Sequence, residues 1–218
     1  MKHTAAIHRA AALFLQHPGP HWPERLRLTR ASLTGLPGDE AEILRRFCDT
    51  VTGLPQQELA ARYMATFVRG RHSLHLPCRT DADGRHRAAS QLRWQRLYRE
   101  HHWQPPAGER PDFLPLVLEF SARHPAAGRR ALAEHRATLE LLRMALAECR
   151  SPYADVLAAI CRTGAPAGQT TGDAAGPTTG HAAGHPAGLP PEELRAELPA
   201  GLPAGLSPRR ERLLAVPN

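Results

Sequence analysis

Apolar residues recur at intervals of three and four along most of residues 1–163, whereas strand-like alternation of β-branched residues is nearly absent. Such intervals are typical of helices that bury one face. The clearest segment is 39–52, where Asp39 and Glu42 have the spacing of a capping box. Its apolar residues share one face: Ile43, Leu44, Phe47, Cys48 and Val51. The pattern therefore predicts an all-α fold.

Two more helices are predicted in the first hundred residues. Residues 55–68 place Leu59, Tyr63 and Phe67 on one stripe, with Gly70 just beyond as a stop signal, and we expect them to form a hairpin with the helix over 39–52. An arginine-rich helix follows over residues 85–103, with apolar Leu92, Leu97 and Tyr98, before Pro105 and Pro106 end it.

The segment 112–122 is apolar nearly all round, which predicts a helix in the middle of a bundle. Because proline is tolerated only in the first turn of a helix, Pro115 requires this helix to begin near Asp112. A long helix over 129–149 is expected next. A last helix, over 151–164, begins at a Ser-Pro pair and ends at a glycine.

The chain changes character at Gly164. Residues 164–218 contain 9 glycines and 9 prolines, and glycine recurs at every fourth position from 164 to 188. A helix with a glycine on every turn loses ~1 kcal/mol at each one relative to alanine. We therefore expect a single helical domain over residues 1–163, monomeric or weakly associating, and a flexible, disordered tail over 164–218.

Charge and cysteine content limit the environment and the partners. The net charge is +7, carried by 27 arginines and one lysine, which favours an acidic partner or a solvated cationic face. Four cysteines without a Cys-x-x-Cys pair indicate a cytoplasmic protein. The longest apolar run near the N-terminus, residues 10–15, is too short for a secretion signal, and no stretch approaches the ~18 apolar residues of a membrane span.

Residue patterns for catalysis and metal binding are weak. His72, His75 and Cys78 form a trio at intervals of three, but zinc sites usually show tighter pairs and a fourth ligand, so no metal or cofactor is assigned. The chain has no Gly-x-Ser-x-Gly elbow, phosphate-binding glycine loop or His-Glu-x-x-His helix, so no catalytic residue is assigned either. We expect a protein that is not an enzyme.

Nucleic-acid binding is an alternative function. Arginines along the helix over 85–103 could meet phosphates, with Trp94 and Tyr98 placed between them to stack on bases. These arginines are Arg85, Arg87, Arg93, Arg96 and Arg99. The competing interpretation is a solvated arginine face.

Two motifs resemble those of a known family, the nitrate reductase molybdenum cofactor assembly chaperones (the NarJ type of the TorD-like redox-enzyme chaperones). The first motif comprises Tyr63, Phe67, Arg69, Gly70, Arg71, Ser73 and Leu74. The second comprises Glu109, Pro111, Asp112, Leu114, Pro115, Leu118, Glu119 and Phe120. Two departures stand out: Phe113 replaces a histidine found in many relatives, and the segment 77–79 replaces a Leu-Phe-Glu run.

The resemblance implies an all-helical cytoplasmic chaperone that binds the apo catalytic subunit of a respiratory nitrate reductase, through the client's N-terminal segment, and assists molybdenum cofactor insertion. We expect no catalytic residue, no cofactor, no stable nucleic acid and no direct membrane insertion. The residues expected to bind the client are Tyr63, Phe67, Arg69, Arg71, Glu109, Asp112 and Glu119. Those expected to shape the motifs are Gly70, Pro111, Leu114 and Pro115.

Alternatives exist for several of these residues. Tyr63 and Phe67 have helical spacing and could simply pack in the core. Asp112 and Glu119 are seven residues apart, close to two helical turns, so both carboxylates could line one edge and receive a cationic client segment. Asp112 could instead be only the N-cap of its helix.

Overall fold

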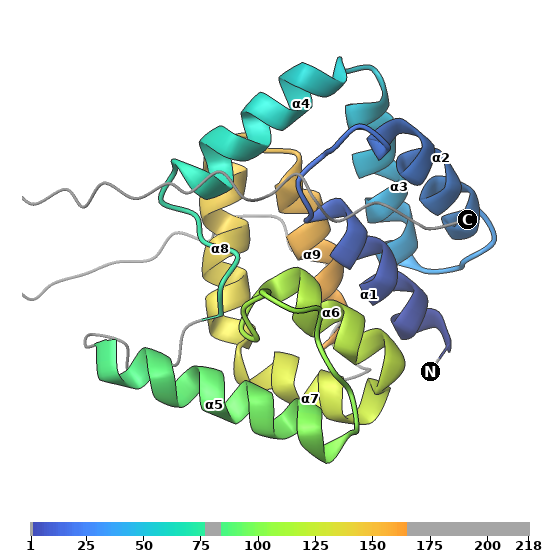
Figure 1. The fold of residues 1–218 in the computed structure, drawn as a ribbon. Coiled ribbons are helices and arrows are strands. Elements are labelled where there is room, and N and C mark those ends of the chain that lie inside the picture. The colour runs from blue at the N-terminus through green and yellow to red at the C-terminus, as the bar shows by residue number, and fades with distance from the viewer. Residues whose placement is uncertain (1, 77–83, 165–218) are drawn as a thin grey trace, which may run out of the picture. The chain divides into compact units, whose positions relative to one another are not determined.

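The computed structural model describes residues 2–76 and 84–164, without the side chains of 84–87. The predicted tail beyond Gly164 and the segment 77–79 lie outside this part. Within it, the regular elements are helices (Figure 1), and the extended structure is limited to one isolated bridge. The helices are α1 (Lys2–Phe14), α2 (Trp22–Leu33), α3 (Asp39–Thr52), α4 (Gln56–Tyr63), the π-helical turn η1 (Met64–Val68), α5 (Gly84–Glu100), α6 (Leu114–Arg123), α7 (Pro125–Glu134), α8 (Arg136–Glu148) and α9 (Tyr153–Thr163). The all-α prediction is confirmed.

Helices α1, α6 and α9 form the centre of the bundle. Helix α1 packs against both α6 and α9, while α3 and α8 cover other faces of α9 (Figure 1). Small residues allow the close approach of α1, whose Ala10, Ala11 and Ala12 are buried. Helix α6 is buried along most of its length, as its apolar sequence predicts.

One polar junction joins these three central helices. His8 of α1 places Nδ1 2.9 Å from the Ser121 hydroxyl of α6 and Nε2 2.7 Å from the Thr163 hydroxyl of α9. The Thr163 hydroxyl donates to the Ile160 carbonyl, so it accepts from Nε2–H and leaves Nδ1 as the acceptor for Ser121. Burial, aided by the nearby Arg129, lowers the pKa of His8 to about 4. His8 is therefore neutral at physiological pH.

The crossing of α6 and α7 depends on Gly128. A Cβ atom at this position would collide with the backbone and side chain of Ser121, the hydroxyl partner of His8. Absence of a side chain thus lets α7 lie directly on α6. This contact is continuous with the polar junction.

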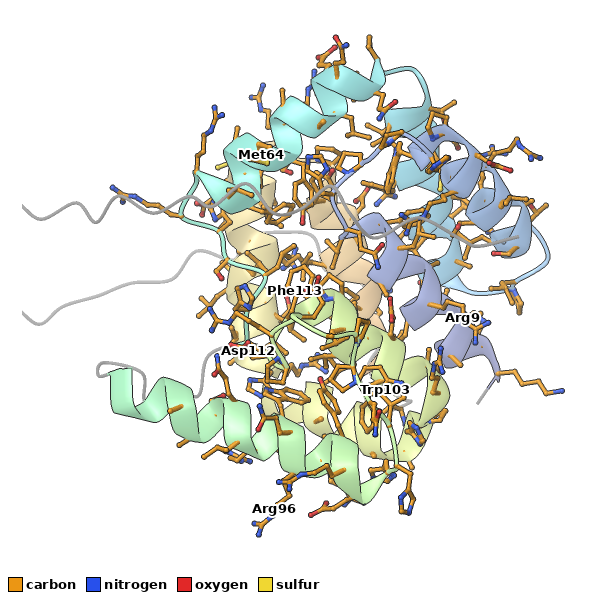
Figure 2. All side chains as sticks on the ribbon, viewed as in Figure 1. Arg9, Met64, Arg96, Trp103, Asp112 and Phe113 are labelled. Carbon is orange, nitrogen blue, oxygen red and sulfur yellow. The ribbon has the colours of Figure 1, made fainter. Side chains whose placement is uncertain are left out.

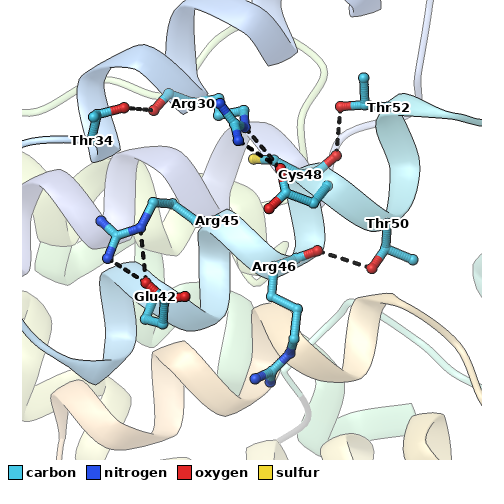
Figure 3. Close-up of polar contacts among 9 residues, drawn as sticks. Arg30, Thr34, Glu42, Arg45, Arg46, Cys48, Thr50 and Thr52 are labelled. Atoms are coloured by element: carbon cyan, nitrogen blue, oxygen red, sulfur yellow. Dashed lines mark hydrogen bonds and ion pairs between the residues drawn. The ribbon is translucent and has the colours of Figure 1, made fainter.

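Helix α3 has the predicted bounds but a different start. Gly38 occupies the N-cap position with φ 97°, and no side chain caps the helix, so the capping box predicted for Asp39 and Glu42 is wrong. Asp39 instead accepts a hydrogen bond from Arg162 of α9, and Glu42 pairs with Arg45 at 2.6 Å (Figure 3). Helix α3 packs mainly on α9 and α2, and its contact with α4 is marginal, so the predicted hairpin does not form.

Three other boundaries differ from the sequence predictions. The helix expected over 129–149 is two helices, α7 and α8, separated at His135, whose ring stacks on Trp94 with centroids 5.5 Å apart. Helix α5 ends at Glu100 rather than near 103, and Leu92 on it is 60% exposed. Helix α6 begins at Leu114 rather than near residue 112, although Pro115 lies in its first turn as predicted.

Candidate functional site

The two sequence motifs lie side by side. His75 and Phe113 form an antiparallel β-bridge between them. The Leu76 N–H donates to the Asp112 carbonyl at 2.9 Å, and the Leu114 N–H donates to the Leu74 carbonyl at 2.7 Å. Two segments that are more than thirty residues apart in sequence thus form one local structure, which we call the motif bridge.

The first motif reaches this bridge through a π-helical turn. Helix α4 continues into η1, where the Arg69 N–H donates to the Met64 carbonyl five residues earlier, at 2.9 Å. Gly70 follows immediately, and a Cβ there would collide with the carbonyls of Thr66 and Ala65. The missing side chain therefore lets the chain leave the helix at this point.

Beyond Gly70 the chain is extended and alternates between core and solvent. Leu74 and Leu76 are buried, whereas Ser73 is exposed and His75 is half-buried. The Ser73 hydroxyl accepts a hydrogen bond from the His75 N–H at 3.1 Å. This alternation anchors one side of the segment in the core and leaves the other side at the surface.

The aromatic residues of the first motif pack in the core. Tyr63 is 5% exposed, and its hydroxyl donates to the Leu15 carbonyl at 3.0 Å. Its ring lies 5.9 Å from that of Tyr153 of α9, and the ring of Phe67 lies 5.0 Å from the same tyrosine. Phe67 is only half-buried, so it reaches the surface beside η1. The core-packing interpretation is confirmed for Tyr63.

Asp112 is the buried charge at the motif bridge (Figure 2). It is 3% exposed, and its carboxylate lies 3.3 Å from His75 Nδ1 and 3.1 Å from the Arg110 guanidinium. Burial tends to raise the pKa of Asp112, but His75 and Arg110 outweigh it and hold that pKa below its usual range. Asp112 is therefore a carboxylate that pairs with both segments of the bridge.

Asp112 does not cap helix α6. Phe113 occupies the N-cap position with an extended backbone, and no side chain there accepts a hydrogen bond from the helix. The N-cap interpretation of Asp112 is wrong, because the backbone from 112 to 114 pairs with the first motif before the helix begins. The ring of Phe113, the residue that departs from the family pattern, packs on His75 at 5.4 Å.

Helix α5 contacts the second motif through Tyr98. The Tyr98 hydroxyl donates to the Pro111 carbonyl at 2.7 Å, and both residues are buried. Burial raises the pKa of Tyr98, so it remains a hydrogen-bond donor at all physiological pH values. Sequence reasoning missed the roles of Tyr98, His75 and Arg110, although Arg110 lies inside the second motif.

The remaining predicted residues lie in two places. Arg69, Arg71 and Glu109 are exposed, and no ion pair forms on them within the described residues. Glu119 is half-buried and accepts a hydrogen bond from Gln16 at 3.2 Å. Because Asp112 precedes α6 and contacts the first motif, the structure does not show the two carboxylates lining one edge.

The aromatic residues required for nucleic-acid binding are not accessible. Trp94 is 5% exposed and Tyr98 1% exposed, so neither can stack on a base. Arg93 pairs with Glu134 of α7, and Arg96 lies 3.9 Å from Glu100. The side chains at 85 and 87 lie outside the described part. Arg93 and Arg96 thus lie on a solvated face of α5 and have carboxylate partners nearby.

The histidines of the suggested metal trio point to different partners. His72 Nε2 lies 3.7 Å from the sulfur of Cys149, whereas His75 faces Asp112, and Cys78 is outside the described residues. Within residues 2–76 and 84–164, no group of three or more potential ligands is positioned to hold a metal ion.

Comparison with known proteins places both motifs in one family. Residues 34–159 match the nitrate reductase delta subunit family. The chain belongs to this family. It is also 37% identical, over 165 residues, to the nitrate reductase-like protein NarX from two strains of Mycobacterium tuberculosis. The match covers 75% of this chain and 25% of NarX, so the chain spans about a quarter of the length of these relatives. None of the helices described for this delta-family chain is long and apolar enough to cross a bilayer.

Proposed function

We propose that this delta-family chain is a dedicated assembly chaperone for a respiratory nitrate reductase. It binds the apo catalytic subunit in the cytoplasm, through the N-terminal segment of that subunit, and keeps it competent for molybdenum cofactor insertion. Family membership supports a role in nitrate reductase assembly. The observation that carries the proposal is the motif bridge, because it brings the two motifs side by side.

The contact surface consists of residues that precede the bridge in the two motifs and are exposed or half-buried. Phe67 and Val68 offer an apolar edge, and Val68 is 59% exposed. Arg69 and Arg71 follow this edge directly in sequence, and Glu109 lies in the second motif; all three are exposed and together carry charges of both signs. An apolar edge with flanking charges suits an amphipathic client segment. We call these five residues the motif surface.

Buried residues of the same motifs position this surface. Tyr63 ties the end of α4 to Leu15, the residue after α1, and Asp112 ties the second motif to His75. Gly70, Pro111, Leu114 and Pro115 shape the backbone between them. Tyr63 and Asp112 thus act on client binding through the exposed residues, and the chaperone supplies binding rather than a chemical step.

The direct test is calorimetric titration of the full chain with a peptide from the N-terminus of the nitrate reductase catalytic subunit. Arg69 and Arg71 are exposed, so replacing both with alanine should leave thermal unfolding unchanged. The peptide Kd should rise roughly tenfold, as expected from loss of charge-assisted contacts. A matched control replaces Arg96 and Arg99, which are also exposed.

The control separates contact from charge. If the motif surface binds the client, the Arg96 and Arg99 double variant keeps the wild-type Kd. An equal rise of Kd in both double variants would reduce the effect to net charge and contradict the proposal. So would a peptide Kd that neither variant changes.

A further inference from the structure

A cavity of about 530 Å³ lies where α1, α2 and α6 meet, apart from the motif surface. Its lining is Arg9, Leu13, Gln16, Arg25, Glu119, Ala122 and Arg123. Arg9 and Leu13 are four residues apart on α1, as are Glu119 and Arg123 on α6, so each pair lies on one helix face. Figure 2 labels Arg9 on α1. We call this the arginine cavity.

Cations outnumber anions in this cavity. Three guanidinium groups face it with a single carboxylate, that of Glu119. Among the described residues, Arg9, Arg25 and Arg123 make no ion pair within 4 Å, whereas arginines such as Arg46 are paired elsewhere in the bundle. The cavity thus concentrates positive charge that the chain's own described carboxylates do not neutralise.

A hydrogen-bond relay through Gln16 links Glu119 to Arg25. Gln16 donates through Nε2 to Glu119 at 3.2 Å and accepts through Oε1 from Arg25 Nη2 at 2.5 Å. Gln16 therefore stands between the cation and the anion, and their direct contact is replaced by two hydrogen bonds. Arg9 and Arg123 are exposed, with no hydrogen bond of their side chains among the described contacts.

We propose that the arginine cavity binds a small organic anion through a phosphate or carboxylate group. Guanidinium groups present planar donor pairs that match both oxyanions in a bidentate arrangement. Leu13 and Ala122 provide an apolar wall for the body of the ligand. The volume exceeds what one inorganic ion fills. This site goes beyond the proposed client binding and reverses the charge expected for a ligand at Glu119.

The experiment is calorimetric titration of the full chain with three probes of similar shape: phenyl phosphate, benzoate and neutral benzamide. Saturable binding of at least one anion, with none for benzamide, is expected. Binding of one anion and not the other identifies the oxyanion group. Failure of both anions to bind saturably, or equal binding of benzamide, overturns the proposal.

Variants locate the bound anion. Arg9→Gln and Arg123→Gln should each weaken anion binding roughly tenfold, as expected for loss of a charge-assisted hydrogen bond. The controls Arg96→Gln and Arg130→Gln remove arginines that line a different cavity, between α5 and α7. If the controls weaken binding as much as the cavity variants, the anion is held by general charge and the site is wrong.

Glu119→Gln gives a result of opposite sign. Glutamine can still accept from Gln16 while removing the negative charge, so the anion Kd should fall several-fold. If Glu119 instead receives a cationic client segment, the same variant raises the client peptide Kd. The anion site and the proposed client binding can therefore fail separately. If the anion Kd does not fall in Glu119→Gln, only the anion site is contradicted.

Discussion

His8 and Asp112 are both buried titratable residues that join distant segments, but they do so in opposite charge states. His8 is neutral and holds α1, α6 and α9 together through two hydroxyl groups. Asp112 is charged and pairs with His75 of the first motif and with Arg110 of its own motif. The first junction lies in the centre of the bundle. At the second, the side chains that contact Asp112 are partly exposed: 35% for His75 and 41% for Arg110.

The difference shows how burial selects the chemistry of a junction. In the centre, a charge would have no solvated partner, and desolvation keeps the imidazole neutral. At the motif bridge, the partners of Asp112 remain in contact with water, so the desolvation cost of its carboxylate is reduced and Asp112 stays charged. The central junction should therefore be the more sensitive to shape and to mild acid.

The largest effect is expected from overfilling the central junction. Gly128→Ala should reduce the free energy of unfolding by about 3 kcal/mol, because the new Cβ collides with the Ser121 backbone and two helices must move apart. Urea unfolding measures it. Gly53→Ala is the control, since a Cβ there meets nothing within 4 Å and should change little. Equal losses of unfolding free energy in Gly128→Ala and Gly53→Ala would mean that the α6–α7 crossing can accommodate a methyl group.

The next effect is the acid sensitivity of the central junction. The folded pKa of His8 is about 4, below the ~6.5 of an unfolded histidine, so the unfolded chain binds more protons between these values. Stability should fall as pH falls through this window, by about 2 kcal/mol from His8 alone between pH 7 and 5.

A substitution isolates this contribution. His8→Gln removes the titration while keeping hydrogen-bonding capacity, so the variant should be less stable than wild type at pH 7 and lose less on going to pH 5. Urea unfolding at both pH values compares them. An equal loss in both proteins would assign the acid sensitivity to the other histidines, among which His124 and His135 also have lowered pKa values.

Loss of the charge at the motif bridge should matter less. Asp112→Asn should cost about 1 kcal/mol, since the ion pair with Arg110 and the charged contact with His75 are lost but both partners remain partly solvated. Because the pKa of Asp112 is lowered, its stabilising contribution is full above ~4 and disappears only as pH falls through the lowered value. Titration of Asp112 itself therefore adds no difference in stability between pH 7 and 5, in contrast to titration of His8.

Hydrogen exchange locates that loss. The Leu76 and Leu114 amides, which donate across the bridge, should exchange about five-fold faster in Asp112→Asn, in keeping with ~1 kcal/mol. If both amides exchange at the wild-type rate in Asp112→Asn, the backbone pairing holds without the carboxylate.

The smallest effect is expected at the exposed edge of the bridge. Ser73→Ala removes the acceptor of the His75 N–H, which can bond water instead, so the loss should be about 0.5 kcal/mol. Thermal unfolding of Ser73→Ala and wild type measures this loss. A loss matching that of Asp112→Asn would make the local turn, rather than the ion pairs, the main support of the bridge.

Periodicity predicted the helices that are governed by their own sequence. Helix α3 has the expected bounds because its apolar stripe is regular, and α9 ends at Gly164 as expected. The break at His135 was not predictable, since nothing in 129–149 interrupts a helical pattern and the ring of Trp94 stacks on His135 from another helix. In α5, aromatic Trp94 and Tyr98 are buried while Leu92 is exposed.

The motif residues could be found in the sequence, but their pairing could not. A bridge of two backbone hydrogen bonds between 74–76 and 112–114 leaves no periodic signal. It also explains why α6 begins at Leu114: the residues before it are engaged by the first motif. The seven-residue spacing of Asp112 and Glu119 was therefore misread as two turns of one helix.

The π-helical turn before Gly70 has a consequence for chain length. A π turn contains one residue more than an α turn, so η1 holds, in effect, an inserted residue. One residue corresponds to about 100° of helical rotation. The inserted residue therefore sets the direction, around the helix axis, in which the chain leaves the helix toward Arg69 and Arg71. Two homologous chains with identical motif letters but a different residue count between Tyr63 and Gly70 would present those arginines to different neighbours.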